Sequence, residues 1–144
     1  MEIASPNDTA RAFINAIDKQ EQLSHKIFNL GGGESCRIIY DDFLSHSFKI
    51  YGLGKLDFPL KTFAEKNFHC GYYEDGDILN NILNFRKDTM FNYYDNQKKN
   101  VSFLKKIAIS IFQKPIKIYL QSQSEPLAAY VNNDIKSINH YLKN

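Results

Sequence analysis

Tyr51 and Lys55 have the spacing of a catalytic tyrosine–lysine pair. On a helix, residues four apart share a face, so the ammonium group would lower the pKa of the phenol and prepare it for proton transfer. Here Gly52 and Gly54 stand between the two residues, at the expected end of a helix. Glycines end helices readily, so the two side chains need not share a face. We therefore predict no catalytic residues.

Histidines, cysteines and paired acids add little further chemistry. The histidines show no paired spacing of the zinc type. Cys70 would need a base and an oxyanion site to act as a nucleophile, and the sequence indicates neither. The neighbouring acids Asp41 and Asp42 point to different helix faces. We therefore predict no metal site. The groups considered are His25, His46, His69, Cys36, Cys70, Asp41 and Asp42.

The glycine turn Gly31-Gly32-Gly33 ends a short apolar run and is followed by Glu34. A glycine turn between a strand and a helix can hold a pyrophosphate, because backbone amides approach the phosphates closely there. This turn has neither the Gly-x-Gly-x-x-Gly spacing nor a complete βαβ unit around it. We therefore predict that this chain alone binds no dinucleotide cofactor.

An aromatic cluster has two interpretations; its members are Phe68, Tyr72 and Tyr73, together with His69. Its members can pack an irregular segment against helices as core. Its phenols and the imidazole can also hydrogen-bond a sugar or stack on a base. Arg86 has the same ambiguity, because a guanidinium can bind a phosphate or form a salt bridge at a helix start. The residues alone leave both interpretations open.

Size and composition describe one globular unit. A chain of 144 residues with 43% hydrophobic and 24% charged residues is long enough to bury a core. The formal net charge of +2 gives no reason to expect nucleic acid or a membrane as a partner. Six lysines and no acid lie between Lys98 and Lys117, a pattern typical of the solvent-exposed side of helices. With two cysteines and no signal-peptide pattern, we expect a cytoplasmic protein.

These residues need elements to position them, and the sequence predicts mostly helices. Ser5, Pro6 and Asp8 begin a helix over 5–19, whose apolar face is Ala10, Phe13, Ile14 and Ile17. Further helices are expected over 40–51, from Asp75 or Asp77 to Leu83, and in the segment that follows Asp88. Another is expected over 101–112, before the interruption at Pro115. The last is expected from Leu127 to Leu142, with a break at Asn132 and Asn133. Short strands are expected over 25–30, 36–38 and 67–70. The predicted fold class is α/β, mostly helical with a few short strands.

The order of these segments resembles a known enzyme family. The helix, the run Lys26 to Ser35, the segment Phe58 to Gly76 and the stretch Asn84 to Thr89 followed by Tyr93-Tyr94 are similar to the substrate-binding half of NAD-dependent epimerases and dehydratases. This is the extended short-chain dehydrogenase/reductase family. The resemblance covers residues 5 to 98, so we divide the chain into a substrate-binding portion, 1–98, and a helical tail of the same unit, 99–144.

The resemblance implies a function shared between two halves. In the family, a Rossmann portion holds NAD(P) and supplies the catalytic groups, and the other portion closes over a substrate that is often a nucleotide sugar. The chain would be the second portion and inactive alone. The turn near Gly31 would then lie on the substrate side. The predicted substrate-binding residues are Asn29, Gly31, Gly32, Phe68, His69, Tyr72 and Arg86.

Two other functions compete with this hypothesis. A half-enzyme exposes the apolar surface that packs on the Rossmann sheet, so the chain can be a stand-alone interaction module, a homo-oligomer or the partner of a Rossmann-type protein. The helix over 5–19 and the strand that follows it are the segments expected to be exposed. The lysines between 98 and 117, with Phe103 and Tyr119, would alternatively form a nucleic-acid surface, although the bulk charge argues for no nucleic-acid partner.

Overall fold

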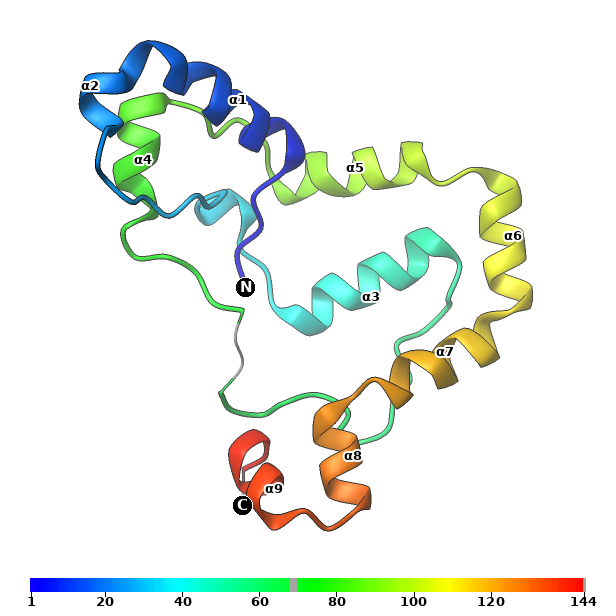
Figure 1. The fold of residues 1–144 in the computed structure, drawn as a ribbon. Helices are drawn as coiled ribbons and strands as arrows, with labels where there is room; N and C mark the ends of the chain where they lie inside the picture. Colours follow the sequence, from blue (N-terminus) through cyan, green and yellow to red (C-terminus); the bar gives the residue numbers. More distant parts are fainter. Residues whose placement is uncertain (68–69, 144) are drawn as a thin grey trace. The chain divides into compact units, whose positions relative to one another are not determined.

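Helices form the regular structure of the protein in a computed structural model that describes residues 1–67 and 70–143 (Figure 1). Short 3₁₀ turns lie at Ile17–Lys19 and Glu34–Cys36. The α-helices are α1 (Pro6–Ala16), α2 (Gln20–Leu23), α3 (Tyr40–Tyr51), α4 (Gly76–Leu83), α5 (Met90–Asn100), α6 (Phe103–Ile111), α7 (Gln113–Ser122), α8 (Glu125–Val131) and α9 (Ile135–Tyr141).

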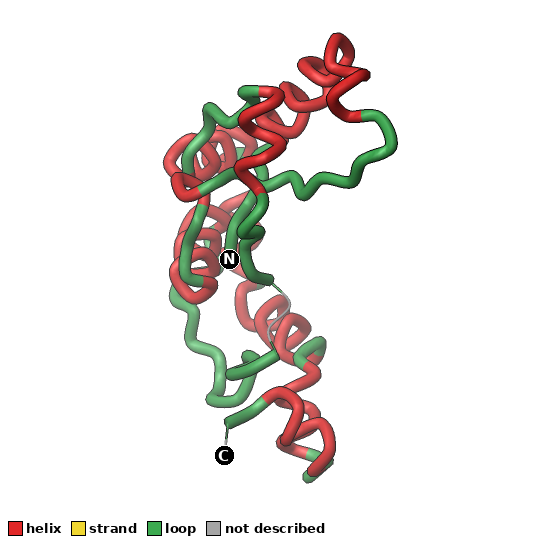
Figure 2. The backbone as a smooth tube through the Cα atoms, turned by 90° about the vertical axis from the view of Figure 1, so that its left-hand side faces the viewer, coloured by secondary structure: helices red, strands yellow, loops and turns green. Residues whose placement is uncertain are grey.

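The predicted α/β class is wrong, because the described residues contain no β-strand (Figure 2). The expected strand over 25–30 is a loop. The expected strand over 36–38 amounts to one isolated antiparallel bridge between Glu2 and Arg37. A strand needs a neighbour to satisfy its backbone groups, and a local apolar run does not supply one. Of the strand expected over 67–70, residues 68–69 lie outside the described part of the chain.

The predicted helix ends are present where local signals are strong. Ser5 caps α1 by accepting a hydrogen bond from the Asp8 amide at 3.0 Å, and Pro6 takes the first helical position. The helix α3 ends at Gly52, whose φ of +87° is a left-handed conformation that favours glycine. Asn132 and Asn133 separate α8 from α9, and Asn133 also has a positive φ of 53°. Short-range chemistry fixes these boundaries.

Contacts divide the described chain into two compact units, and each combines two segments. Unit 1 comprises Met1–Phe43 and Cys70–Gln97, and unit 2 comprises Leu44–His69 and Lys98–Asn144. The division predicted after residue 98 marks the end of the resemblance to the enzyme family. It is a boundary of a different kind from these two units, which are defined by contacts.

Unit 1 has a small core between α1 and α4. Ala12, Leu79, Leu83 and Phe85 are buried there, and Phe28 and Leu30 of the preceding loop pack against them. The buried side of α1 is therefore the side of Ala12 and Asp8. The apolar face predicted for this helix points outward, because Phe13, Ile14 and Ile17 are 71%, 64% and 74% exposed.

Unit 2 is held together by a loop that follows α3 and by the last two helices. Ser124 caps α8 through the Leu127 amide and donates its hydroxyl to the Thr62 carbonyl at 2.6 Å. The Glu65 amide donates to the Tyr141 carbonyl at 2.8 Å, and the Glu65 carboxylate accepts the Lys143 amide. The Phe48 and Phe58 rings meet edge to face, 5.6 Å apart. No helix in the described residues is long and apolar enough to span a membrane.

Candidate functional site

The glycine turn lies in unit 1, pressed against the N-terminal segment. The amide of Gly33 donates to the carboxylate of Glu2 at 2.9 Å, and Gly33 has a φ of +77°. A Cβ atom at Gly32 would overlap the carbonyl oxygen of Ile3 and lie 2.6 Å from the Cβ of Cys36. The turn therefore needs glycine at both positions, because one is left-handed and the other is in close backbone contact.

Arg86 joins the glycine turn to α4. Its Nε donates to the Gly31 carbonyl at 2.7 Å, across 55 residues of sequence, and its guanidinium also pairs with Asp77. The side chain is only 12% exposed. A Cβ at Gly33 or at Gly76 would lie within 3 Å of its terminal nitrogens. Arg86 is thus enclosed between two glycines, and this contact fixes the turn in place.

A buried polar cluster at the start of α1 supports the turn from the other side. The Asp8 carboxylate is fully buried and accepts the backbone amides of Lys87 at 2.9 Å and Asp88 at 3.1 Å. Arg11 pairs with Asp8 and donates to the Phe85 carbonyl at 3.1 Å. A buried carboxylate with these donors is satisfied, so Asp8 anchors the segment after α4 on α1.

The titrating groups of this cluster are held in unreactive states. The Ser5 hydroxyl donates to Asp88 at 2.5 Å, and this bond, aided by Arg11 and opposed by burial, lowers the pKa of the Asp88 carboxyl. Burial raises the pKa of the Cys36 thiol, which contacts the Asp88 carbonyl at 3.4 Å. A thiol acts as a nucleophile only as its thiolate, so Cys36 is a packing residue.

Four of the predicted substrate-binding residues lie together at the turn and the start of α4. Gly31 and Gly32 form the turn that Arg86 holds, as described above. Asn29 precedes the turn and donates from its Nδ2 to both carboxylate oxygens of Asp75, at 3.0 and 3.1 Å. Asn29 and Arg86 thereby attach the turn to the two acids at the start of α4, Asp75 and Asp77.

Of the remaining predicted site residues, Tyr72 contacts Arg37, which lies outside the turn, and Phe68 and His69 are not among the described residues. Tyr72 is 57% exposed and stacks under the Arg37 guanidinium, 4.2 Å from the ring centre. Arg37 in turn pairs with Glu2 at 3.0 Å. Phe68 and His69 lie outside the described residues, so their roles stay predictions.

The tyrosine–lysine pair at 51 and 55 is separated by the end of α3. Gly52 and Gly54 both have positive φ values, 87° and 74°. Lys105 of α6, not Lys55, stands over the Tyr51 ring, 5.9 Å from its centre. The carbonyl of Lys55 accepts a hydrogen bond from Lys117 at 2.7 Å.

The sequence did not reveal the partners of the turn. Glu2, Asp8, Arg11 and Asp88 form its polar surroundings. Asp8 and Asp88 carried only helix-start signals, and Glu2 and Arg11 carried none. Asp8 and Asp88 are 80 residues apart, and no local pattern joins them. Among residues 1–67 and 70–143, no group of three or more metal-ligating side chains could hold an ion.

Comparison with known proteins adds no assignment. No protein-family model, no curated protein and no solved structure matches this chain.

Proposed function

We propose that this chain is a binding module, the substrate-binding portion of an NAD-dependent epimerase or dehydratase, which works together with a Rossmann-type portion. The outer face of α1 is the surface through which the two portions associate. The proposal rests on the resemblance of residues 5 to 98 and does not require the α/β fold, which the helices overturn. It includes a cytoplasmic location, where the thiols Cys36 and Cys70 stay reduced.

The orientation of α1 is the observation that supports this proposal best. Phe13, Ile14 and Ile17 form one stripe at helical spacing and are 64–74% exposed, while the opposite side of α1 packs on α4 through Ala12. Burying a Phe or Ile side chain contributes about 1.5–3 kcal/mol. A partner that covers all three gains several kcal/mol, which is the scale of a specific association.

The glycine turn supports the substrate-binding part of the proposal. Arg86 fixes the carbonyl of Gly31, and Asn29 is fixed by Asp75, so the turn is rigidly positioned in unit 1. A ligand gains affinity when the groups that contact it are already ordered. In the family the equivalent turn lies beside the substrate, and a nucleotide-sugar-like molecule is the expected ligand.

Association with a Rossmann-type portion can be measured by sedimentation velocity. The probe is the purified Rossmann portion of a nucleotide-sugar epimerase with NAD bound. The proposal predicts a complex with the chain, and loss of that complex in the double variant Phe13→Ser, Ile17→Ser. The matched control, Phe91→Ser with Ile27→Ser, removes side chains that are 77% and 99% exposed elsewhere in unit 1 and leaves the complex intact.

Calorimetry with small molecules tests which ligands the chain binds without the Rossmann-type portion. The chain alone should give no saturable heat with NAD⁺ and a saturable heat with UDP-glucose. Saturable NAD⁺ binding by the unassisted chain contradicts the proposal, because the Rossmann portion is assigned that task.

A second copy of the chain is the alternative occupant of the α1 stripe. The same exposed side chains favour it, and a symmetric dimer would pair the stripe with itself. Sedimentation of the chain alone distinguishes the two: a concentration-dependent dimer that Phe13→Ser abolishes assigns the stripe to self-association.

A further inference from the structure

The helix α6 in unit 2 also presents its apolar side outward. Phe103, Leu104, Ile107 and Ile111 fall within about 100° of the helix circumference, given 100° per residue. Their exposed fractions are 76%, 76%, 41% and 70%. We call these four residues the α6 stripe. An amphipathic helix normally turns such a stripe toward a core, so this one is positioned to be covered by something else.

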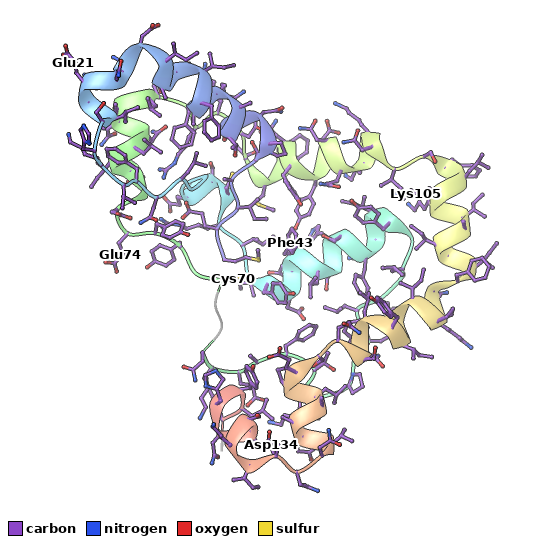
Figure 3. The ribbon with its side chains drawn as sticks, in the orientation of Figure 1. Glu21, Phe43, Cys70, Glu74, Lys105 and Asp134 are labelled. Carbon is purple, nitrogen blue, oxygen red and sulfur yellow. The ribbon has the colours of Figure 1, made fainter. Side chains whose placement is uncertain are left out.

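Lysines lie beside and behind the α6 stripe. At 100° per residue, Lys106 is about 60° from Phe103 and Lys105 is about 100° from Leu104, and both are exposed. Lys105 stands over the Tyr51 ring, and the stem of Lys106 packs against Gly52. Lys106 thus packs its stem against the end of α3, and Lys105 turns its ammonium group toward Tyr51, while the apolar side chains of α6 are exposed. Figure 3 labels Lys105 on α6.

Further positive charge surrounds the same helix. Lys98 and Lys99 precede α6 and Lys114 follows it, all three exposed, and no acid occurs from Lys98 to Lys117. An open hollow of about 340 Å³ adjoins the N-terminal end of the stripe. It combines three lysines with an apolar lining: Lys49, Ile50, Lys98, Val101, Phe103 and Lys106.

We propose that α6 binds the surface of an anionic lipid bilayer. The α6 stripe enters the boundary between headgroups and acyl chains, and the flanking lysines contact lipid phosphates and carboxylates, with one headgroup in the hollow. Lysines beside large apolar residues on one short helix are the pattern of interfacial helices that lie in the membrane plane. The formal net charge of the whole chain is only +2, so it does not reveal this local concentration of lysines around α6.

Charge decides between this partner and a second copy of the chain. Two copies joined through their α6 stripes would bring two sets of lysines together with no acid among them, and like charges at an interface are costly. An anionic membrane surface attracts the same lysines. The proposal concerns unit 2 alone and does not depend on the association proposed for α1.

Tryptophan fluorescence with vesicles tests the proposal directly, because the chain contains no tryptophan. The variant Phe103→Trp places a reporter on the stripe, and Phe91→Trp places a control at a side chain of equal exposure, 77%, in unit 1. With phosphatidylcholine–phosphatidylserine vesicles, the emission at position 103 should shift to the blue and that at 91 should not. A shift at both positions, or at neither, overturns the proposal.

Flotation with the same vesicles tests the role of the lysines. The double variant Lys98→Gln, Lys106→Gln should bind roughly 25-fold more weakly, because each lysine near an anionic surface contributes about fivefold. The control Lys26→Gln, Lys136→Gln changes the net charge equally at two exposed lysines outside α6 and should bind almost as the natural chain does. Equal weakening by both pairs, or equal binding to pure phosphatidylcholine, overturns the proposal. Absence of any vesicle binding also overturns it and points to an acidic protein partner.

Discussion

The helices α1 and α6 carry the same pattern and differ in what surrounds it. Each shows an apolar stripe to the outside, with Phe13 71% and Phe103 76% exposed. The inner side of α1 is fixed by a buried carboxylate that pairs with an arginine, whereas Lys105 and Lys106 on the inner side of α6 meet Tyr51 and Gly52. The charged residues of α1 are Asp8 and Arg11, one of each sign, and those of α6 are two lysines.

An apolar stripe on a helix indicates a surface that another molecule or segment covers, but it does not identify what covers it. Charge beside the stripe is the additional information. For α1 it leaves a protein surface as the fitting partner, and for α6 it favours an anionic one. If this comparison holds, changes on the inner side of α1 should destabilise the protein strongly, and changes in either stripe should barely affect its folding.

Removal of the Asp8 carboxylate should have the largest effect. The variant Asp8→Ala leaves the amides of Lys87 and Asp88 without their acceptor and Arg11 without its main partner. Breaking a buried charge pair costs about 3–5 kcal/mol of unfolding free energy. Urea unfolding followed by circular dichroism measures it, with Asp18→Ala, at an exposed position beside α1, as the control. A loss below about 1 kcal/mol, the scale of one ordinary hydrogen bond, contradicts the anchoring role of Asp8.

Crowding of the glycine turn should have the next largest effect. In Gly32→Ala the new Cβ overlaps the Ile3 carbonyl, and overpacking of this kind costs about 1–3 kcal/mol. Gly71→Ala is the matched control, because a Cβ there meets no atom within 4 Å. The same unfolding measurement compares the two variants. Equal losses at both positions would show that the close approach of the turn to Ile3 is absent in solution.

Acid should weaken unit 1 through Asp88. Because the folded state lowers the pKa of this carboxyl, its contribution to stability is complete above its ordinary pKa, about 3.9, and is lost as the pH falls through the lower folded value. The variant Ser5→Ala removes the strongest cause of the lowered pKa, and its carboxyl should titrate at higher pH. An NMR titration of the Asp88 carboxyl carbon measures this. An unchanged titration in Ser5→Ala contradicts the role assigned to the 2.5 Å bond.

Loss of a stripe residue should have the smallest effect on stability. Phe13→Ser and Phe103→Ser each remove a large apolar side chain that is mostly exposed, and surface changes of this kind stay within about 0.5 kcal/mol. Phe85→Ala is the comparison, since that ring is fully buried and its truncation costs about 3–5 kcal/mol. Urea unfolding of the three variants would contradict the outward orientation if a stripe variant lost as much as Phe85→Ala.

Local signals made part of the fold predictable. The cap at Ser5, the helix over 40–51 with its glycine end, and the break at Asn132 and Asn133 all follow from interactions between residues close in sequence. The apolar stripe of α1 was also readable from the sequence. Its direction was not, because periodicity defines a face without defining what covers it.

The rest depended on contacts between distant segments. A run such as 25–30 becomes a strand only beside another strand, and here it packs on the unit 1 core as a loop through Phe28 and Leu30. In the candidate site, Arg86 was predicted either to bind a phosphate or to form a salt bridge at a helix start, and its partners are Gly31 and Asp77, an acid in the first turn of α4. The sequence singled out the residue, but only the fold could supply these partners.

Quenching of single tryptophans by acrylamide tests the central claim, that both apolar stripes face the solvent. Phe13→Trp and Phe103→Trp give one reporter each in a chain with no natural tryptophan. In the isolated, monomeric chain, both should be quenched nearly as efficiently as free N-acetyltryptophanamide. Quenching several-fold weaker at either position would show that the chain buries that stripe itself, and would contradict the account for that helix.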